Sequence, residues 1–199
     1  MIPRAHVTAW RAKAPWPDNS QVEQDLILSR ALIDIFRHPV VADHAIFRGG
    51  TALHKLFFDP AGRYSEDIDL VQRKAGPIGE LINAIREVID PWLGDPTWKQ
   101  GKGRFTLYYR FKTTFVPVVN MRLKIEINTR EHFSVLGLKQ LNYSVSNPWF
   151  SGVNKKTVPF SSMIAMEDVF KSHPYRIYFS FLSNLANHCT GRRKVTGSG

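Results

Sequence analysis

Two neighbouring stretches of this 199-residue chain decide its fold: Phe47-Arg-Gly-Gly-Thr-Ala-Leu-His-Lys55 and Arg63-Tyr-Ser-Glu-Asp-Ile-Asp-Leu70. In the first, a short apolar strand is predicted to end at a Gly-Gly turn, and a helix to begin at Thr51. In the second, Asp67 and Asp69 alternate with apolar residues, so a strand directs both carboxylates to the same face. A strand, a Gly-Gly-Thr turn, a helix and an Asp-x-Asp strand in this order are far more specific than any one of them.

This combination suits the metal-dependent transfer of a nucleotidyl group from an NTP. Mg²⁺ prefers carboxylate oxygens, and two such ions can clamp the attacking and leaving oxygens of a phosphate, so we expect the two aspartates to hold Mg²⁺ or Mn²⁺. Backbone N–H groups of Gly49 and Gly50, placed at a helix start, can approach a triphosphate. Thr51 or Ser65 can add a hydroxyl, and Arg63 flanks the site as a phosphate ligand.

A third carboxylate is expected from the alternating stretch 121–128. Glu126 lies on the polar side of this predicted strand. If the strand pairs beside the Asp-x-Asp strand with the apolar faces aligned, Glu126 lies next to the two aspartates. The alternative is a solvated carboxylate paired with Lys124 or Arg122.

Three further residues are expected near the site, and two of them have a second interpretation. Arg48 and Lys55 flank the site as possible phosphate contacts, but Lys55 equally fits the exposed face of its helix. His54 is more typical of a structural or surface histidine than of a general base.

The other elements follow from hydrophobic periodicity. Ser20-Gln-Val-Glu23 predicts a capping box for a long apolar helix that Pro39 ends. Further elements are expected at 45–47 (strand), 51–58 (helix), 67–71 (strand), 77–92 (helix), 95–103 (polar loop), 105–111 (strand), 135–137 and 143–145 (short strands) and 162–171 (helix). We expect an irregular arm over 1–19, the main domain over 20–160 and an atypical C-terminal segment over 161–199.

The chain is strongly basic, with 27 Lys and Arg against 17 Asp and Glu and a net charge of +10. Such a charge favours a polyanionic partner, RNA or DNA, although a basic protein without a nucleic-acid role has the same composition. A basic stretch with interleaved aromatic residues suits a nucleic-acid groove, or else an ordinary strand with a charged outer face. Its members are Lys99, Lys102, Arg104, Arg110 and Lys112, with Tyr108 and Tyr109.

Composition also excludes several classes of protein. The single cysteine, Cys189, excludes an internal disulfide and any multi-cysteine metal site. No apolar run is long enough to span a bilayer, and the N-terminus has no signal region, so we expect a cytoplasmic protein without a membrane partner.

At three motifs in the same order, the chain resembles the AbiEii/AbiGii family of nucleotidyltransferases, which includes the MenT-type toxins. The motifs are the two stretches quoted above and Leu123-Lys-Ile-Glu-Ile-Asn128, and the resemblance covers about residues 20–155. It implies an α/β (α+β) fold, the polymerase-β-like nucleotidyltransferase fold with a mixed sheet flanked by helices. It also implies the toxin of a type IV toxin–antitoxin or phage-defence system, with a cognate antitoxin as partner. Some relatives add nucleotides to the 3′ end of tRNA.

The resemblance implies roles for individual residues: Gly49, Gly50 and Ser65 hold the triphosphate, Asp67 and Asp69 bind the metals, and Glu126 is the third acidic residue. Lys171, in Met-Glu-Asp-Val-Phe-Lys171, stands for a lysine in the family's C-terminal helical region. The Arg-Asp…Asp pattern that usually follows that lysine is missing here.

Three hypotheses result. The first is a Mg²⁺-dependent nucleotidyltransferase that transfers NMP to RNA, with tRNA as the expected acceptor. The second is a truncated, inactive remnant that binds nucleotide, RNA or the antitoxin without turnover, because the C-terminal pattern is missing. The third is a phosphotransferase acting on a small molecule, and the basic charge argues against it.

Overall fold

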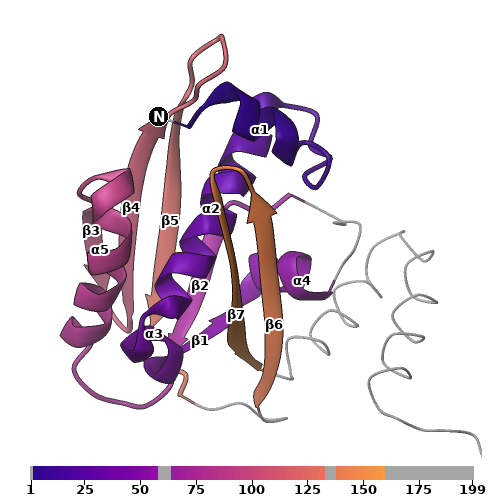
Figure 1. Ribbon diagram of the computed structural model, residues 1–199. Coiled ribbons are helices and arrows are strands. Elements are labelled where there is room, and N and C mark those ends of the chain that lie inside the picture. The colour runs from indigo at the N-terminus through magenta and orange to yellow at the C-terminus, as the bar shows by residue number, and fades with distance from the viewer. Residues whose placement is uncertain (1, 58–63, 133–137, 160–199) are drawn as a thin grey trace, which may run out of the picture. The chain divides into compact units, whose positions relative to one another are not determined.

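The structure is a computed structural model that describes residues 2–57, 64–132 and 138–159 (Figure 1). These residues all belong to one compact unit, Met1–Ser162. Four of the features expected from the sequence lie outside the described residues: Arg63, Lys171, the strand at 135–137 and the helix at 162–171.

A five-stranded mixed sheet forms the centre of the fold, with the strand order β1-β2-β5-β4-β3. The strands are β1 (Ala45–Arg48), β2 (Asp67–Gln72), β5 (Asn120–Asn128), β4 (Arg104–Lys112) and β3 (Thr97–Gly101). β2 and β5 are parallel, whereas the other three pairs of neighbouring strands are antiparallel. The prediction of an α/β fold with a mixed sheet flanked by helices is therefore confirmed.

Helices α2 (Asn19–Arg37) and α5 (Gly79–Leu93) cover one face of this sheet (Figure 1). The alternation in β2 and β5 explains why, since Ile68, Leu70, Ile125 and Ile127 all point to that face and are at most 1% exposed. Burying these apolar side chains against the helices is the main favourable term for the fold. The opposite face of the two strands carries their charged side chains.

The start of α2 differs from the predicted capping box. The N-cap is Asp18, whose backbone N–H donates to Oε1 of Gln21 at 3.5 Å in a capping box two residues earlier than expected. Glu23 is instead buried, and its carboxylate accepts hydrogen bonds from the backbone N–H and the hydroxyl of Thr114, each at 2.8 Å. The sequence contains two overlapping capping patterns, and tertiary burial of Glu23 decides between them.

The end of α2 agrees with the prediction. The helix stops at Arg37, and His38 adopts an extended conformation before Pro39. Pro39 then occupies the first turn of a short helix that the periodicity did not indicate, α3 (Pro39–His44). Proline is tolerated there because the first N–H groups of a helix have no intrahelical partner.

Residues 1–19 are not the irregular arm that their Pro-rich composition predicted. They contain α1 (Arg4–Trp10), whose Val7 and Trp10 side chains are buried in the core. A helix of seven residues is marginal in isolation, so its packing against α2 stabilises it.

Strand β3 occupies most of the stretch that was predicted as a polar loop. All five of its residues are exposed, so their side chains show no alternation that could indicate a strand. Backbone pairing with β4 at the sheet edge forms it, and Trp98 stacks on Phe105 with ring centroids 5.6 Å apart.

A separate hairpin consists of β6 (Leu138–Asn147) and β7 (Phe150–Pro159) and lies beside α2 (Figure 1). It includes the short strand predicted at 143–145, where Tyr143 and Val145 are buried. In the part of the chain that the structure describes, no helix has the length and apolar character needed to cross a bilayer.

Candidate active site

The pairing of β2 with β5 brings the three predicted carboxylates together. Asp69 lies directly opposite Glu126 in the parallel pair, and Asp67 lies opposite Lys124. The expectation that the two strands align their apolar faces is confirmed, since Ile68 faces Ile125 across the strands. Carboxylates at paired positions of neighbouring strands point to one face of the sheet and lie close together.

Lys124 lies within this group of carboxylates. Its ammonium nitrogen is 2.9 Å from Oδ2 of Asp67 and 3.4 Å from Oε2 of Glu126. Glu126 therefore pairs with Lys124, as the alternative interpretation proposed, and at the same time lies beside the two aspartates. Sequence reasoning named Lys124 only as a possible partner, although the alternation that selected Glu126 also puts Lys124 on the same face.

Electrostatics at the site reflect partial burial. Burial raises the pKa of Asp69, and the neighbouring charge of Lys124 opposes this rise while that of Asp67 adds to it. Burial disfavours the Lys124 ammonium, but its hydrogen bond to Asp67 and the attraction of both partner carboxylates leave the pKa of Lys124 raised. The site thus gathers three carboxylates around the Lys124 ammonium, and the Arg104 guanidinium also lies 3.5 Å from Oε1 of Glu126.

The Gly-Gly turn adjoins this group of carboxylates. Gly49 is the first residue of α4 (Gly49–Phe57) and has a φ of 81°, a conformation that residues with a β-carbon rarely adopt. A β-carbon at this position would overlap the carboxylate of Asp69. A glycine is therefore required both by the backbone conformation and by the close approach of the acidic strand.

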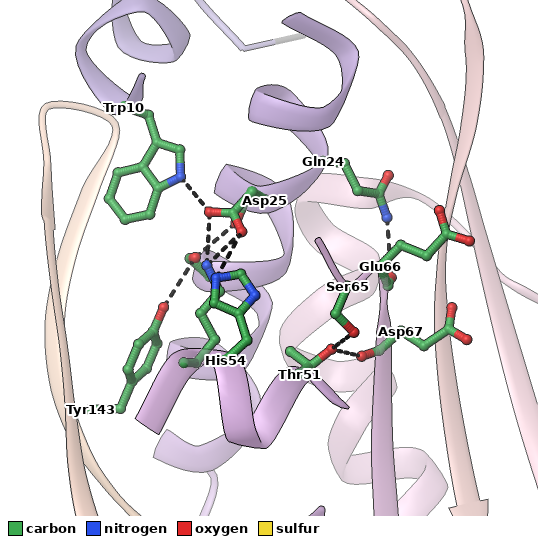
Figure 2. A network of polar contacts seen from close by, with 11 residues as sticks. Trp10, Gln24, Asp25, Thr51, His54, Ser65, Glu66, Asp67 and Tyr143 are labelled. Atoms are coloured by element: carbon green, nitrogen blue, oxygen red, sulfur yellow. Dashed lines mark hydrogen bonds and ion pairs between the residues drawn. The ribbon is translucent and has the colours of Figure 1, made fainter. Parts of the chain in front are cut away.

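Thr51 and Ser65 link the start of α4 to the start of β2 (Figure 2). The Thr51 hydroxyl donates to the backbone carbonyl of Asp67 and lies 2.7 Å from the Ser65 hydroxyl. Thr51 is fully buried, whereas Ser65 is half-buried. The structure thus engages the Thr51 hydroxyl inside the protein, where it holds the Gly-Gly turn against the Asp-x-Asp strand.

Behind this turn lies a buried ionic network around Asp25 (Figure 2). The Lys55 ammonium is 2.7 Å from both carboxylate oxygens of Asp25, and the indole N–H of Trp10 donates to the same carboxylate at 2.7 Å. The Lys55 side chain is only 7% exposed. Both expectations for Lys55, a phosphate contact and an exposed helix face, are therefore wrong, because its charge is used to neutralise Asp25.

His54 is part of the same network. Its side chain is 6% exposed, its Nε2 lies 3.9 Å from Oδ1 of Asp25, and its ring meets Trp16 edge-on with centroids 5.2 Å apart. The interpretation of His54 as a structural histidine agrees with this position.

The two tyrosines of the basic stretch around β4 lie on opposite faces of the sheet. Tyr109 is fully buried, and its hydroxyl donates to Asp90 at 2.8 Å, so the prediction of a stacking role for Tyr109 is wrong. Tyr108 lies on the polar face, where the guanidinium of Arg122 is 5.5 Å from its ring centroid. Arg48, expected as a phosphate contact, forms an ion pair with Glu131.

The carboxylates fit the chemistry of a hard divalent cation. Asp67, Asp69 and Glu126 supply oxygen ligands from neighbouring strands, and the ammonium of Lys124 demonstrates that the position between Asp67 and Glu126 accepts positive charge. The three carboxylates are too far apart to hold one metal ion together, since among the described residues no three His, Cys, Asp or Glu side chains have the required spacing.

Comparison with known proteins gives a family match and several solved structures with a similar fold. Residues 30–166, more than half of the chain, match the family model described as "Nucleotidyl transferase AbiEii toxin, Type IV TA system". The fold is similar to that of MenT4, a nucleotidyltransferase toxin of Mycobacterium tuberculosis H37Rv, with a TM-score of 0.57 and 21% identity over 85% of this chain. An H. pylori protein described as a candidate nucleotidyltransferase is 21% identical over 61% of this chain, with a TM-score of 0.45.

The likeness to MenT4 supports the predicted polymerase-β-like fold. This chain spans 58% of the MenT4 chain and 51% of the H. pylori chain, little more than half the length of either. A comparison with curated proteins found no match.

Proposed function

Since the chain belongs to the AbiEii family of type IV nucleotidyltransferase toxins, we propose that it transfers a nucleotidyl group from an NTP to RNA with the help of Mg²⁺ or Mn²⁺. One observation carries the proposal: Asp67, Asp69 and Glu126 lie together on the polar face of β2 and β5, directly beside the Gly49 turn. Nucleotidyl transfer depends mainly on positioning and on neutralising phosphate charge, which is what such a site offers.

The acidic residues and the Gly-Gly turn have separate roles in this proposal. Asp67 and Asp69 would hold the metal, which would neutralise charge on the phosphate oxygens and orient them, and Glu126 would complete the acidic group. Gly49 and Gly50 present backbone N–H groups to the triphosphate at the start of α4.

The remaining nucleotide-binding residues have different roles. Ser65 adds a hydroxyl to the triphosphate, and Thr51 holds the turn in place from behind. Arg63 and Lys171 stay predictions for the triphosphate and for catalysis, since both lie outside the described residues.

Lys124 is the residue that must change partners. In the structure its ammonium forms ion pairs with Asp67 and Glu126. When a metal and a triphosphate occupy the site, the same ammonium is free to contact a phosphate oxygen instead.

The acceptor and the partner follow from charge and family. The net charge of +10 supports an RNA acceptor, and membership in the family supports the 3′ end of tRNA and a cognate antitoxin that opposes the toxin. Such a substrate places the protein in the cytoplasm.

A transfer assay tests this function. The protein is incubated with each radiolabelled NTP, Mg²⁺ or Mn²⁺ and total tRNA, and label in the RNA is measured. We expect label from at least one NTP, and a loss of at least about 100-fold in Asp67→Asn and Asp69→Asn, because each removes a charged metal ligand. The matched control is Asp95→Asn, since that carboxylate is 89% exposed and forms an ion pair with Arg86. Absent transfer in the wild type, or undiminished transfer in both site variants, contradicts the proposal.

A second candidate is a protein that binds nucleotide or RNA without turnover. The observation in its favour is that Lys124 already pairs with Asp67 and Glu126, which lowers the net charge available to a metal. Saturable binding of NTP by the wild type, combined with no transfer to any RNA, would support this candidate.

A further inference from the structure

The polar face of the sheet continues past the carboxylates onto β4. In register, Asp67 lies opposite Lys124, and Lys124 lies opposite Tyr108 on the next strand. Adjacent strands are about 4.8 Å apart, so Tyr108 lies roughly 10 Å from Asp67. Any molecule lying across these strands therefore contacts Tyr108 and the acidic group together.

Two arginines face each other beside this tyrosine. Arg110 on β4 and Arg122 on β5 are directly opposite in the antiparallel pair, and both are exposed. Like charges at directly opposite positions destabilise a sheet. Within residues 2–57, 64–132 and 138–159, neither arginine forms an ion pair. The same is true of the exposed Lys112, which is the next residue of β4 on this face. We call Tyr108, Arg110, Lys112 and Arg122 the arginine–tyrosine surface.

A shallow hollow adjoins this surface. It has a volume of about 720 Å³, and its lining includes the three cations of the surface together with Phe111, Asn120 and Met121. One carboxylate, that of Glu66, also lines it. Positive charge thus outnumbers negative charge by three to one around a cavity whose walls include apolar and aromatic groups.

The strand order separates this surface from the Gly-Gly turn. The turn follows β1, which lies on one side of β2, whereas β5 and β4 lie on the other side. If the triphosphate binds at the turn, as proposed above, a second phosphate-bearing molecule reaches the carboxylates from the opposite side. Two arginines and a lysine suit phosphate oxygens, and the Tyr108 ring suits an unpaired base.

We propose that the arginine–tyrosine surface binds the single-stranded end of the nucleic-acid acceptor, with Arg110 and Arg122 on backbone phosphates and Tyr108 stacked on a base. This proposal rests on the proposed function, whose second substrate it locates. A single strand is favoured over a duplex because only an unpaired base exposes its face for stacking.

The test measures binding, which does not depend on turnover. Fluorescence anisotropy of a 3′-labelled single-stranded RNA is followed for the wild type and for the variants Arg110→Gln, Arg122→Gln and Tyr108→Ala over a range of salt concentrations. We expect Tyr108→Ala to weaken binding by about 5- to 150-fold, the range for one lost base–aromatic contact. Each arginine variant should reduce the slope of log K against log salt by about 0.7 to 1. The matched control is Arg86→Gln, on helix α5 at the other face of the sheet.

Stability provides an independent control for folding. Because Arg110→Gln relieves a like-charge pair, this variant should unfold at the same or a slightly higher temperature while it binds RNA more weakly. A lower unfolding temperature together with weaker binding would mean that the arginine is structural, and would overturn the proposal.

The other outcomes separate this proposal from the proposed function. If the variants bind RNA more weakly but the wild type transfers no nucleotide, the RNA-binding role of the surface is supported and the proposed nucleotidyl transfer is rejected. Normal RNA binding in all three variants overturns the surface, whatever the transfer assay gives. Lost NTP binding with RNA binding retained assigns the surface to the triphosphate and overturns the proposal. Duplex RNA that binds the wild type as tightly as single-stranded RNA does also overturns it, because only an unpaired base exposes its face for stacking on Tyr108.

Discussion

Removal of Lys55 from the buried ionic network should destabilise the protein strongly. The Asp25 and Lys55 side chains are 1% and 7% exposed, and their charged groups are 2.7 Å apart. Breaking a buried ion pair by removing one partner costs about 3–5 kcal/mol, because the other charge is left buried without compensation. The whole domain is stable by only about 5–15 kcal/mol, so Lys55→Met should remove a large part of that stability.

The expected stability of the double variant depends on which buried polar groups remain without a partner. In Asp25→Leu with Lys55→Met no buried charge is left, and replacing both members of such a pair by apolar residues is often nearly neutral. The indole N–H of Trp10, however, loses its acceptor on Asp25, and an unsatisfied buried donor costs about 1–3 kcal/mol. We therefore expect the double variant to be more stable than Lys55→Met alone.

Urea denaturation monitored by tryptophan fluorescence and circular dichroism measures these free energies of unfolding. For a domain of this size, about 3–5 kcal/mol corresponds to a decrease in Tm of roughly 6–20 °C. The control is Lys74→Met, since Lys74 is exposed and such surface changes usually stay within about 0.5 kcal/mol. A cost below about 1 kcal/mol for Lys55→Met, or strictly additive single and double variants, would refute the reasoning from burial.

Three further predictions concern the site and the core. Gly49→Ala should lower the Tm and abolish transfer, because a φ of 81° costs a residue with a β-carbon about 1–2 kcal/mol and the new methyl group overlaps Asp69; wild-type transfer by this variant would show that the turn tolerates displacement. Lys124→Met should bind Mn²⁺ on the order of tenfold more tightly, as measured by electron paramagnetic resonance of the free ion, because an ammonium no longer competes for the carboxylates; unchanged affinity would place Lys124 away from the metal. Tyr109→Phe should cost about 1 kcal/mol in urea denaturation, because it removes the 2.8 Å hydrogen bond to Asp90; a gain in stability would contradict this.

The central part of the fold was predictable because its signal is local. In β2 and β5, alternation of charged and apolar residues indicates both the strand and which side chains share a face. The same pattern predicted that Glu126 joins Asp67 and Asp69 once the apolar faces align, and the register of β2 with β5 confirms that alignment. The role of these carboxylates in metal binding stays a prediction.

Other elements carry no such local signal. β3 has five exposed residues, so only its backbone pairing with β4 identifies it as a strand. α1 is a short helix that depends on packing against α2, and its Pro-rich, basic surroundings favour the opposite prediction. In both cases the stabilising partner is the next element along the chain, and the element forms because it packs or pairs there, not because of its own side-chain pattern.

Charged and aromatic side chains were the hardest to assign. Tyr108 and Tyr109 are adjacent in the same strand, yet one lies on the polar face and the other donates to Asp90 inside the core. Alternation separates such neighbours, since Tyr109 shares its face of the strand with Leu107, and Tyr108 shares its face with Arg110. Only the tertiary structure shows that the Tyr109 hydroxyl meets Asp90. Lys55 is a similar case, since nothing near it in the sequence shows that Asp25 lies within 2.7 Å.

By itself the sequence determined the strands β2 and β5, the Gly-Gly turn between strand and helix, and the acidic residues that the two strands direct to one face. These are consequences of periodicity and backbone conformation, which act between near neighbours. Only the tertiary structure decided that Lys55 neutralises Asp25, that Lys124 lies among the site carboxylates, and that Arg110 faces Arg122. The contacts Lys55–Asp25, Lys124–Asp67 and Arg110–Arg122 join residues 12 to 57 positions apart. The charge that each of these side chains meets therefore depends on which strands and helices pack together.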